Sequence, residues 1–187
     1  MRNLAAGLAA FATVLLVAPA PARAATAAPC LAKSGHDATE TRGDSSVDEG
    51  EIRWTAGTKY KAEYQHANRA WSYSGAKIKI APDSATTVND LHYEDFSDGR
   101  NPAAGQWARH PGPAATDVIR FNKARMDTYD AATRRMVAAH ELGHALGLCH
   151  KSDSGKSAVQ SVMWPEAAPY PDVPTAVDKA NYKKLWG

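Results

Sequence analysis

The segment that begins at His140 carries the side chains whose types and spacing could do chemistry. It reads His-Glu-Leu-Gly-His-Ala-Leu-Gly-Leu-Cys-His. His140 and His144 are four residues apart, so on a helix they share one face and could grip one metal ion. Gly147 lets the chain leave that helix sharply, and the turn can bring His150 round as a third ligand. Three nitrogen ligands with a fourth position open to water are typical of catalytic zinc, and Glu141 can reach that water as a general base. The alternative is that these are ordinary surface histidines on a helix.

These side chains need a helix that starts and stops at the right places. Asp130 can cap a helix over 131–146, and Gly147 can end it. The periodicity of the remaining chain predicts further elements: strands at 51–54, 77–80, around 91–93, 105–109 and 118–122, a helix over 58–73, and a final helix over 176–185 capped by Thr175. This order predicts an α+β domain with three main helices packed against a small, twisted, mixed sheet.

The N-terminal part of the chain predicts a leader followed by an arm. A positive start, an uncharged apolar run and the A-x-A sequence at 22–24 are typical of a signal peptide over residues 1–24. The run is too short to favour a membrane anchor. Residues 25–50 are polar and predict an irregular N-terminal arm whose order depends on Cys30. Residues 51–187 would form the folded domain, secreted into the extracellular space.

Charge argues against two classes of partner. Without Arg2 and Arg23, which belong to the leader, 20 Lys and Arg residues face 20 Asp and Glu residues. A near-neutral chain with mixed charges does not favour nucleic acid or an anionic membrane as partner. We expect a monomer that acts on a protein or peptide substrate.

The two cysteines, Cys30 and Cys149, leave two alternatives open. An even pair in an exported protein predicts a disulfide, which here would tie the arm to the histidine segment. Alternatively, Cys30 is a free thiolate that caps and blocks the zinc.

Three stretches of the chain resemble a known family. The run from Val137 to Leu148 resembles the active-site helix of matrixins, the matrix-metalloprotease type of metzincin. Met163, in Val-Met-Trp-Pro, resembles the Met-turn of that family. Asp178, followed by the C-terminal Leu-Trp-Gly, resembles its final helix. Lys151 departs from the pattern, because matrixins usually have a small residue after the third histidine, and no cysteine-switch propeptide is visible.

The resemblance implies a metzincin-like catalytic domain. A larger N-terminal subdomain (51–147) and a small C-terminal one (148–187) would enclose the zinc in a cleft. Met163 would lie beneath the zinc as a hydrophobic base, and Asp178 would have a structural role near the Met-turn. The stretch 165–170 would form one wall of the main pocket.

Matrixins also bind a second zinc and calcium ions, and this chain lacks their full ligand pattern. His92 and His110, with Glu94, Asp95 and Asp98, are nevertheless candidate ligands for such metals. The oxygen-rich stretch 94–98 alone makes calcium a possible second cofactor.

The sequence therefore predicts a secreted zinc endopeptidase in which Glu141 activates a zinc-bound water. An extended substrate would pair with an edge strand within 103–110. Two alternatives remain: a zinc hydrolase acting on a non-protein amide, and a secreted zinc-containing binding protein without turnover. Glu141 argues against the second alternative, because binding alone does not need that carboxylate.

Overall fold

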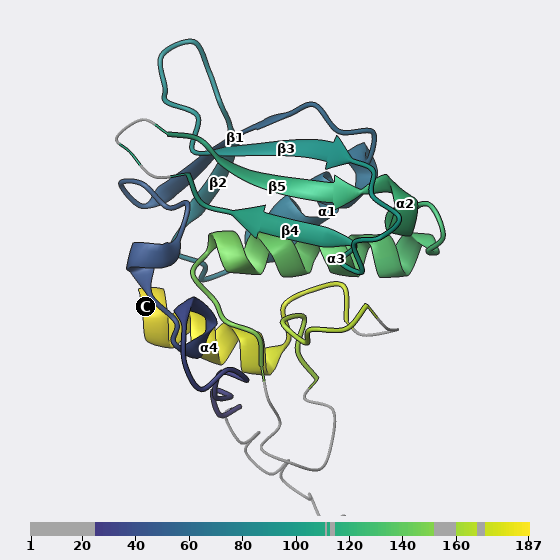
Figure 1. The fold of residues 1–187 in the computed structure, drawn as a ribbon. Coiled ribbons are helices and arrows are strands. Elements are labelled where there is room, and N and C mark those ends of the chain that lie inside the picture. The colour runs from purple at the N-terminus through teal and green to yellow at the C-terminus, as the bar shows by residue number, and fades with distance from the viewer. Residues whose placement is uncertain (1–24, 111, 113–114, 152–159, 168–170) are drawn as a thin grey trace, which may run out of the picture.

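A mixed five-stranded sheet and the helices beneath it form the fold (Figure 1). The computed structural model describes residues 25–110, 112, 115–151, 160–167 and 171–187, so the predicted leader lies outside the described residues. The strands are β1 (Glu51–Ala56), β2 (Lys79–Pro82), β3 (Leu91–Phe96), β4 (Gly105–Ala108) and β5 (Asp117–Asn122). The helices are α1 (Lys61–Trp71), α2 (Lys123–Met126), α3 (Ala131–Ala145) and α4 (Ala176–Trp186). In that part of the chain, no helix has both the length and the apolar character to cross a membrane.

The sheet runs in the order β2-β1-β3-β5-β4. All pairs are parallel except β4–β5, so the sheet ends in one antiparallel edge strand, β4. Strand β5, next to that edge, is buried along nearly its whole length, as strands covered on both faces are. The predicted α+β class with a mixed sheet is confirmed.

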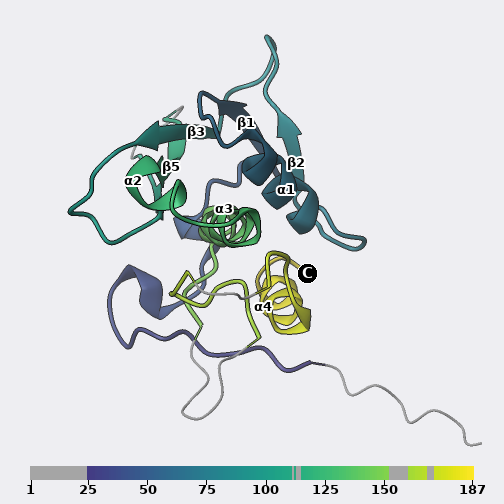
Figure 2. The same cartoon turned by 90° about the vertical axis from the view of Figure 1, so that its right-hand side faces the viewer.

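Helix α3 lies at the centre of the molecule. Figures 1 and 2 both place it between the sheet and α4, with α1 packed alongside. Helix α3 is buried over residues 136–143 and at Ala145. Small residues on α3 allow α1 to approach closely, and the indole N–H of Trp71 on α1 donates to the Ala139 carbonyl at 2.8 Å. The most conspicuous chemistry of the sequence is thus carried by the most enclosed helix.

Helix boundaries follow the capping residues that the sequence offered. Asp130 accepts a hydrogen bond from the Thr133 amide, and Thr175 with Asp178 forms a capping box at the start of α4. Two details differ from expectation. Strand β2 starts two residues later than predicted, because the amides of Lys77 and Ile78 donate to the Tyr182 hydroxyl instead of a strand partner. The single turn α2 was not predicted; the Asn122 side chain caps it locally.

The N-terminal arm is more ordered than predicted, since we expected an irregular segment held by Cys30. It contains two short 3₁₀ helices, His36–Ala38 and Arg42–Asp44. The Ser46 amide donates to the Ala145 carbonyl at 2.8 Å, and the Arg42 side chain donates to the Leu185 carbonyl at 2.7 Å. These contacts fix the arm along the ends of α3 and α4.

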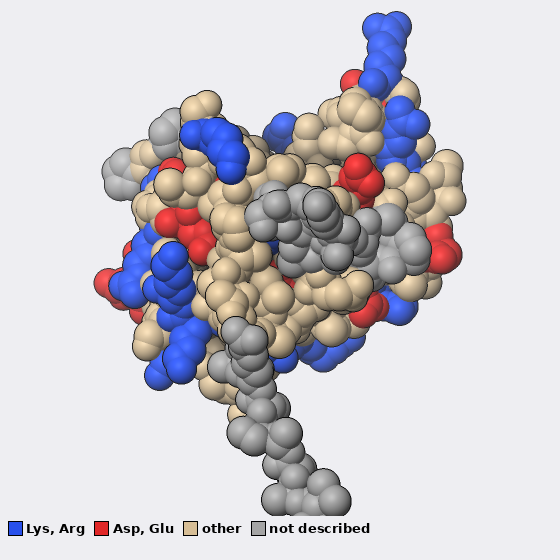
Figure 3. Space-filling model, turned by 90° about the horizontal axis from the view of Figure 1, so that it is seen from below, with Lys and Arg blue, Asp and Glu red and all other residues tan. Residues whose placement is uncertain are grey.

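The predicted disulfide is confirmed: Cys30 is bonded to Cys149 across 119 residues. Cys30 is therefore not a free thiolate that caps a metal. Seen from below (Figure 3), Lys and Arg side chains are interspersed with Asp and Glu side chains over the described surface.

Removal of the disulfide by the double substitution Cys30→Ala and Cys149→Ala is expected to lower the free energy of unfolding by about 2–5 kcal/mol, because it releases a long loop in the unfolded chain. Urea unfolding of the metal-free protein measures the change. Wild-type protein treated with a thiol reductant serves as the matched control and should lose a similar amount. Equal unfolding midpoints for oxidised wild type and the double variant would contradict the expectation.

Candidate metal centre

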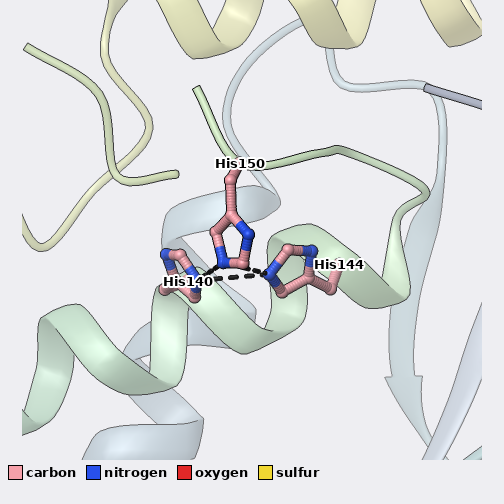
Figure 4. Close-up of side chains that lie close together, drawn as sticks. All are labelled: His140, His144 and His150. Carbon is pink, nitrogen blue, oxygen red and sulfur yellow. Dashed lines mark hydrogen bonds between the residues drawn. The ribbon is translucent and has the colours of Figure 1, made fainter. Parts of the chain in front are cut away.

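Three imidazoles point toward one another at the end of α3 (Figure 4). His140 and His144 lie one helical turn apart, and their Nε2 atoms are 3.2 Å from each other. His150 comes from the segment after the helix, with its Nε2 atom 3.1 Å from that of His140 and 3.2 Å from that of His144. The structure thus brings together the three histidines that the sequence nominated.

Gly147 makes this convergence sterically feasible. Its φ is +81°, a left-handed conformation that side chains with a Cβ rarely adopt. A Cβ at this position would also lie 2.4 Å from the Thr41 carbonyl oxygen in the arm. Only glycine satisfies both conditions, so the chain can turn here and return toward the helix.

The other ring nitrogens determine what the three Nε2 atoms can do. The Nδ1 atoms of His140 and His144 lie 2.9 Å from the carbonyl oxygens of Val162 and Leu148. Carbonyl oxygens only accept hydrogen bonds, so these Nδ1 atoms carry the protons. The Nδ1 atom of His150 lies 2.7 Å from a carboxylate oxygen of Asp37 and carries its proton for the same reason.

With every Nδ1 protonated, the dashed contacts of Figure 4 join three Nε2 lone pairs rather than donors and acceptors. Tetrahedral coordination at about 2.0–2.1 Å would place ligand nitrogens roughly 3.3 Å apart, close to the separations found here. The donor set therefore fits a zinc ion. Burial, followed by the neighbouring His144 and His150, lowers the pKa of His140 well below its usual value, which keeps that ligand neutral.

Glu141 lies next to the triad in an enclosed position. Burial raises the pKa of its carboxyl to about 8, and a backbone hydrogen bond from Trp107 on β4 partly opposes the shift. A Cβ on Gly105 would fall 2.7 Å from the Glu141 side chain, so β4 passes as close to it as a backbone can. The carboxylate is thereby confined between the edge strand and α3.

A cavity of about 740 Å³ opens beside the histidines and Glu141. One side is β4 and the residues before it, and the other is the segment Trp164–Ala167. Tyr129, Met136 and Val137 also line it. Part of the wall expected at 165–170 is thus in place; residues 168–170 lie outside the described residues.

Met163 and Asp178 lie behind the triad. Met163 is fully buried, and its sulfur packs against Gly143 in the turn of α3 that carries the histidines. The buried Asp178 carboxylate accepts hydrogen bonds from the Ser161 hydroxyl at 2.5 Å and the Val162 amide at 3.0 Å. Since the Val162 carbonyl accepts from His140, α4 holds the strip of backbone that orients the first histidine.

The candidate ligands for a second metal do not gather into one site. Glu94 pairs with Arg120, Asp95 accepts from Thr58 and the Lys59 amide, and Asp98 accepts from the Arg100 amide. His92 bonds to the Thr55 hydroxyl at 2.7 Å, and the His110 amide donates to Asp117. Among the residues that the structure describes, the histidine triad is the only group of three or more His, Cys, Asp or Glu side chains close enough to share an ion.

Two acidic residues of the arm were missed by sequence reasoning. Asp37 contacts His150, and Glu40 forms an ion pair with Lys151, whose side chain is fully buried. Burial lowers the pKa of Lys151, and Glu40 opposes that shift. Both pairs span more than 110 residues, so no local spacing could reveal them. The one available signal was the Cys30–Cys149 pairing, which brings this part of the arm near His150.

A family model matches most of the chain. The family model described as Peptidase_M10, Matrixin, matches residues 26–186. No curated protein matches the chain. Among solved structures, the chain is similar to one described as the GM1-bound form of the ECX AB5 holotoxin. That match has 14% sequence identity, covers 73% of this chain and 71% of the other, and has a TM-score of 0.44.

The substitution Gly143→Ala tests the packing behind the triad. A Cβ there would lie 2.2 Å from the Met163 sulfur and 3.2 Å from the Trp71 ring, and both side chains are fully buried. We expect the substitution to lower the free energy of unfolding by about 1–3 kcal/mol. Without the clash, replacing glycine by alanine in a helix would raise it by ~1 kcal/mol. Urea unfolding measures the change.

The matched control is Gly99→Ala, where a Cβ meets nothing within 4 Å. A gain in stability for Gly143→Ala would contradict the tight contact between Met163 and α3.

Proposed function

This chain belongs to the matrixin family, and from that premise we propose that it is a secreted zinc-dependent endopeptidase. The family supports a zinc-dependent metallopeptidase acting on proteins or peptides. The observation that carries the proposal is the convergence of three Nε2 lone pairs beside Glu141, at the edge of a large cavity. A purely structural zinc site would be closed by a fourth protein ligand, whereas this triad faces the cavity.

In the proposed mechanism, His140, His144 and His150 hold the zinc ion. Bound zinc would supply a Lewis acid that polarises the scissile carbonyl and acidifies a water molecule. Glu141 would accept a proton from a water molecule as that water attacks the carbonyl carbon, and would deliver it to the nitrogen of the leaving amine as the C–N bond breaks. Glu141 is enclosed between α3 and β4 and lines the same cavity as the three histidines, so its carboxyl group can reach a water molecule held there.

Substrate binding is proposed to use the edge strand β4. This strand pairs with β5 on one side only, and its residues line the cavity. An extended peptide can add to such an edge through main-chain hydrogen bonds, while its side chains enter the cavity. The proposed site residues thus divide into metal ligands, one acid–base group and a strand that aligns the peptide bond.

The disulfide supports the proposal of secretion, because such bonds persist in oxidising compartments. A monomer and the two subdomains, 51–147 and 148–187, remain proposals. Calcium also remains a proposal, without a gathered site among the described residues.

Glu141→Gln tests the mechanism. We expect casein hydrolysis by the purified mature chain to be abolished by a zinc chelator and to fall roughly 10²–10⁴-fold in the variant, with zinc still bound. Zinc content and initial rates measure the two effects. Glu49→Gln, at an exposed position that does not line the cavity, is the matched control and should retain activity. Unchanged hydrolysis by Glu141→Gln would exclude Glu141 as the base, and a chain that binds no zinc would exclude the proposed function.

Gly105→Ala tests the confinement of the Glu141 carboxylate. The added methyl group would overlap the Glu141 side chain and lie 2.9 Å from Val137, so the carboxylate or the strand must move. Because small misplacements of a reacting group are costly, we expect kcat to fall on the order of 10²-fold with zinc affinity preserved. Steady-state kinetics on a peptide substrate measures this, with Gly99→Ala as control. An unaltered kcat would show that β4 does not position Glu141.

A further inference from the structure

We propose that Asp37 is a positioning residue of the metal centre, which fixes the tautomer and orientation of His150 as the third ligand. The N-terminal arm is then a functional part of the site rather than a lead-in to the domain. This inference rests on the proposed function, because it assigns a role in zinc binding.

Asp37 contacts His150 with both carboxylate oxygens. One oxygen accepts the backbone amide of His150 at 2.8 Å, and the other lies 2.7 Å from its Nδ1 atom. The first contact locates the backbone of the ligand and the second sets the plane of its ring. A single side chain thereby fixes the residue that comes from outside the helix.

His150 needs such a partner more than the other two ligands do. His140 and His144 are carried by a rigid helix, and backbone carbonyls near α3 accept their Nδ1 protons. His150 follows a glycine turn, and its Nδ1 partner is the carboxylate. A carboxylate that accepts the Nδ1 proton leaves the Nε2 lone pair free and makes the imidazole a stronger ligand.

The arm holds Asp37 from both sides. Before it, Cys30 is bonded to Cys149, and the Leu31 amide donates to the His150 carbonyl at 2.8 Å. After it, Glu40 pairs with the buried Lys151, and the Thr41 amide donates to the Gly147 carbonyl at 3.2 Å. The anchors all attach to residues 147–151, so Asp37 is tied to the segment that it orients.

An exposed ion pair would be the simpler interpretation, and such pairs contribute little. Asp37 is instead only about a quarter exposed and has two directed contacts with one histidine. Asp37 also lines the cavity, so it could instead contact or obstruct the substrate. The experiment must distinguish that role from the positioning of His150.

The test is Asp37→Asn, which keeps the size of the side chain. In one orientation of the amide, its NH₂ group faces Nδ1 and favours the Nε2-protonated tautomer, which cannot bind metal through Nε2. In the other, the NH₂ group opposes the His150 amide, donor against donor. We expect zinc affinity, measured by competition with a chromogenic chelator, to fall 10–100-fold. The matched control is Asp44→Asn in the same arm, since Asp44 pairs with Arg109 and not with a histidine.

A second measurement does not depend on any variant. In the metal-free wild type, ¹⁵N NMR of the histidine rings should show His150 as the Nδ1-protonated tautomer. The Nε2-protonated form would overturn the proposal, as would Asp37→Asn protein with wild-type zinc affinity. Faster hydrolysis with unchanged zinc affinity would also overturn it and would identify Asp37 as an obstruction. Wild-type protein that binds no zinc would instead contradict the proposed function itself, so the two failures are distinguishable.

Discussion

The structure depends on keeping the Nε2 atoms of three histidines about 3 Å apart, with their lone pairs directed at one point. Such an arrangement is unfavourable without a cation, because the three atoms repel and none can donate to another. It persists only if every Nδ1 proton has an acceptor elsewhere and the rings cannot rotate away. The acceptors come from Val162, Leu148 and Asp37, which belong to three different parts of the chain. Most of the fold around α3 can be understood as the placement of these acceptors.

Each acceptor has its own supporting contacts. The Val162 backbone is held by Asp178, which also caps α4, so the final helix supports His140 indirectly. The Leu148 carbonyl follows the Gly147 turn and needs only local geometry. The arm supports the wall of the cavity that β4 forms. There the Ser46 hydroxyl donates to Asp117 on β5 and accepts from the Trp107 indole on β4. Elements distant in sequence therefore meet at the metal centre and its cavity because its ligands need partners.

The parts of the site predictable from sequence are those set by local spacing. His140, His144 and Glu141 lie on one helix, Gly147 marks its end, and caps such as Asp130 and Thr175 act within three residues. Asp37 and Glu40 could not be predicted, because their partners are more than 110 residues away and an acidic residue in a polar arm resembles any solvated one. The late start of β2 has a similar cause, since the Tyr182 hydroxyl on α4 takes the first two amides. Long-range polar contacts thus account for what periodicity could not supply.

Lys151, the departure from the family pattern, is explained by the same long-range contacts. A lysine with a fully buried side chain is costly to the fold unless it is paired, and burying an ion pair is weak evidence of stabilisation. Its consequence is positional: Lys151 bonds to Glu40 through its side chain and to the Met163 carbonyl through its amide at 2.9 Å. Glu40 also accepts from Asn181 on α4 at 3.1 Å. One residue after the third histidine, the chain is therefore fixed at once to the arm, to the methionine segment and, through Glu40, to the last helix. A small residue in place of Lys151 would leave the Glu40 carboxylate without its charge partner. The arm would then be held less firmly after Asp37, whereas the disulfide would still hold it before Asp37.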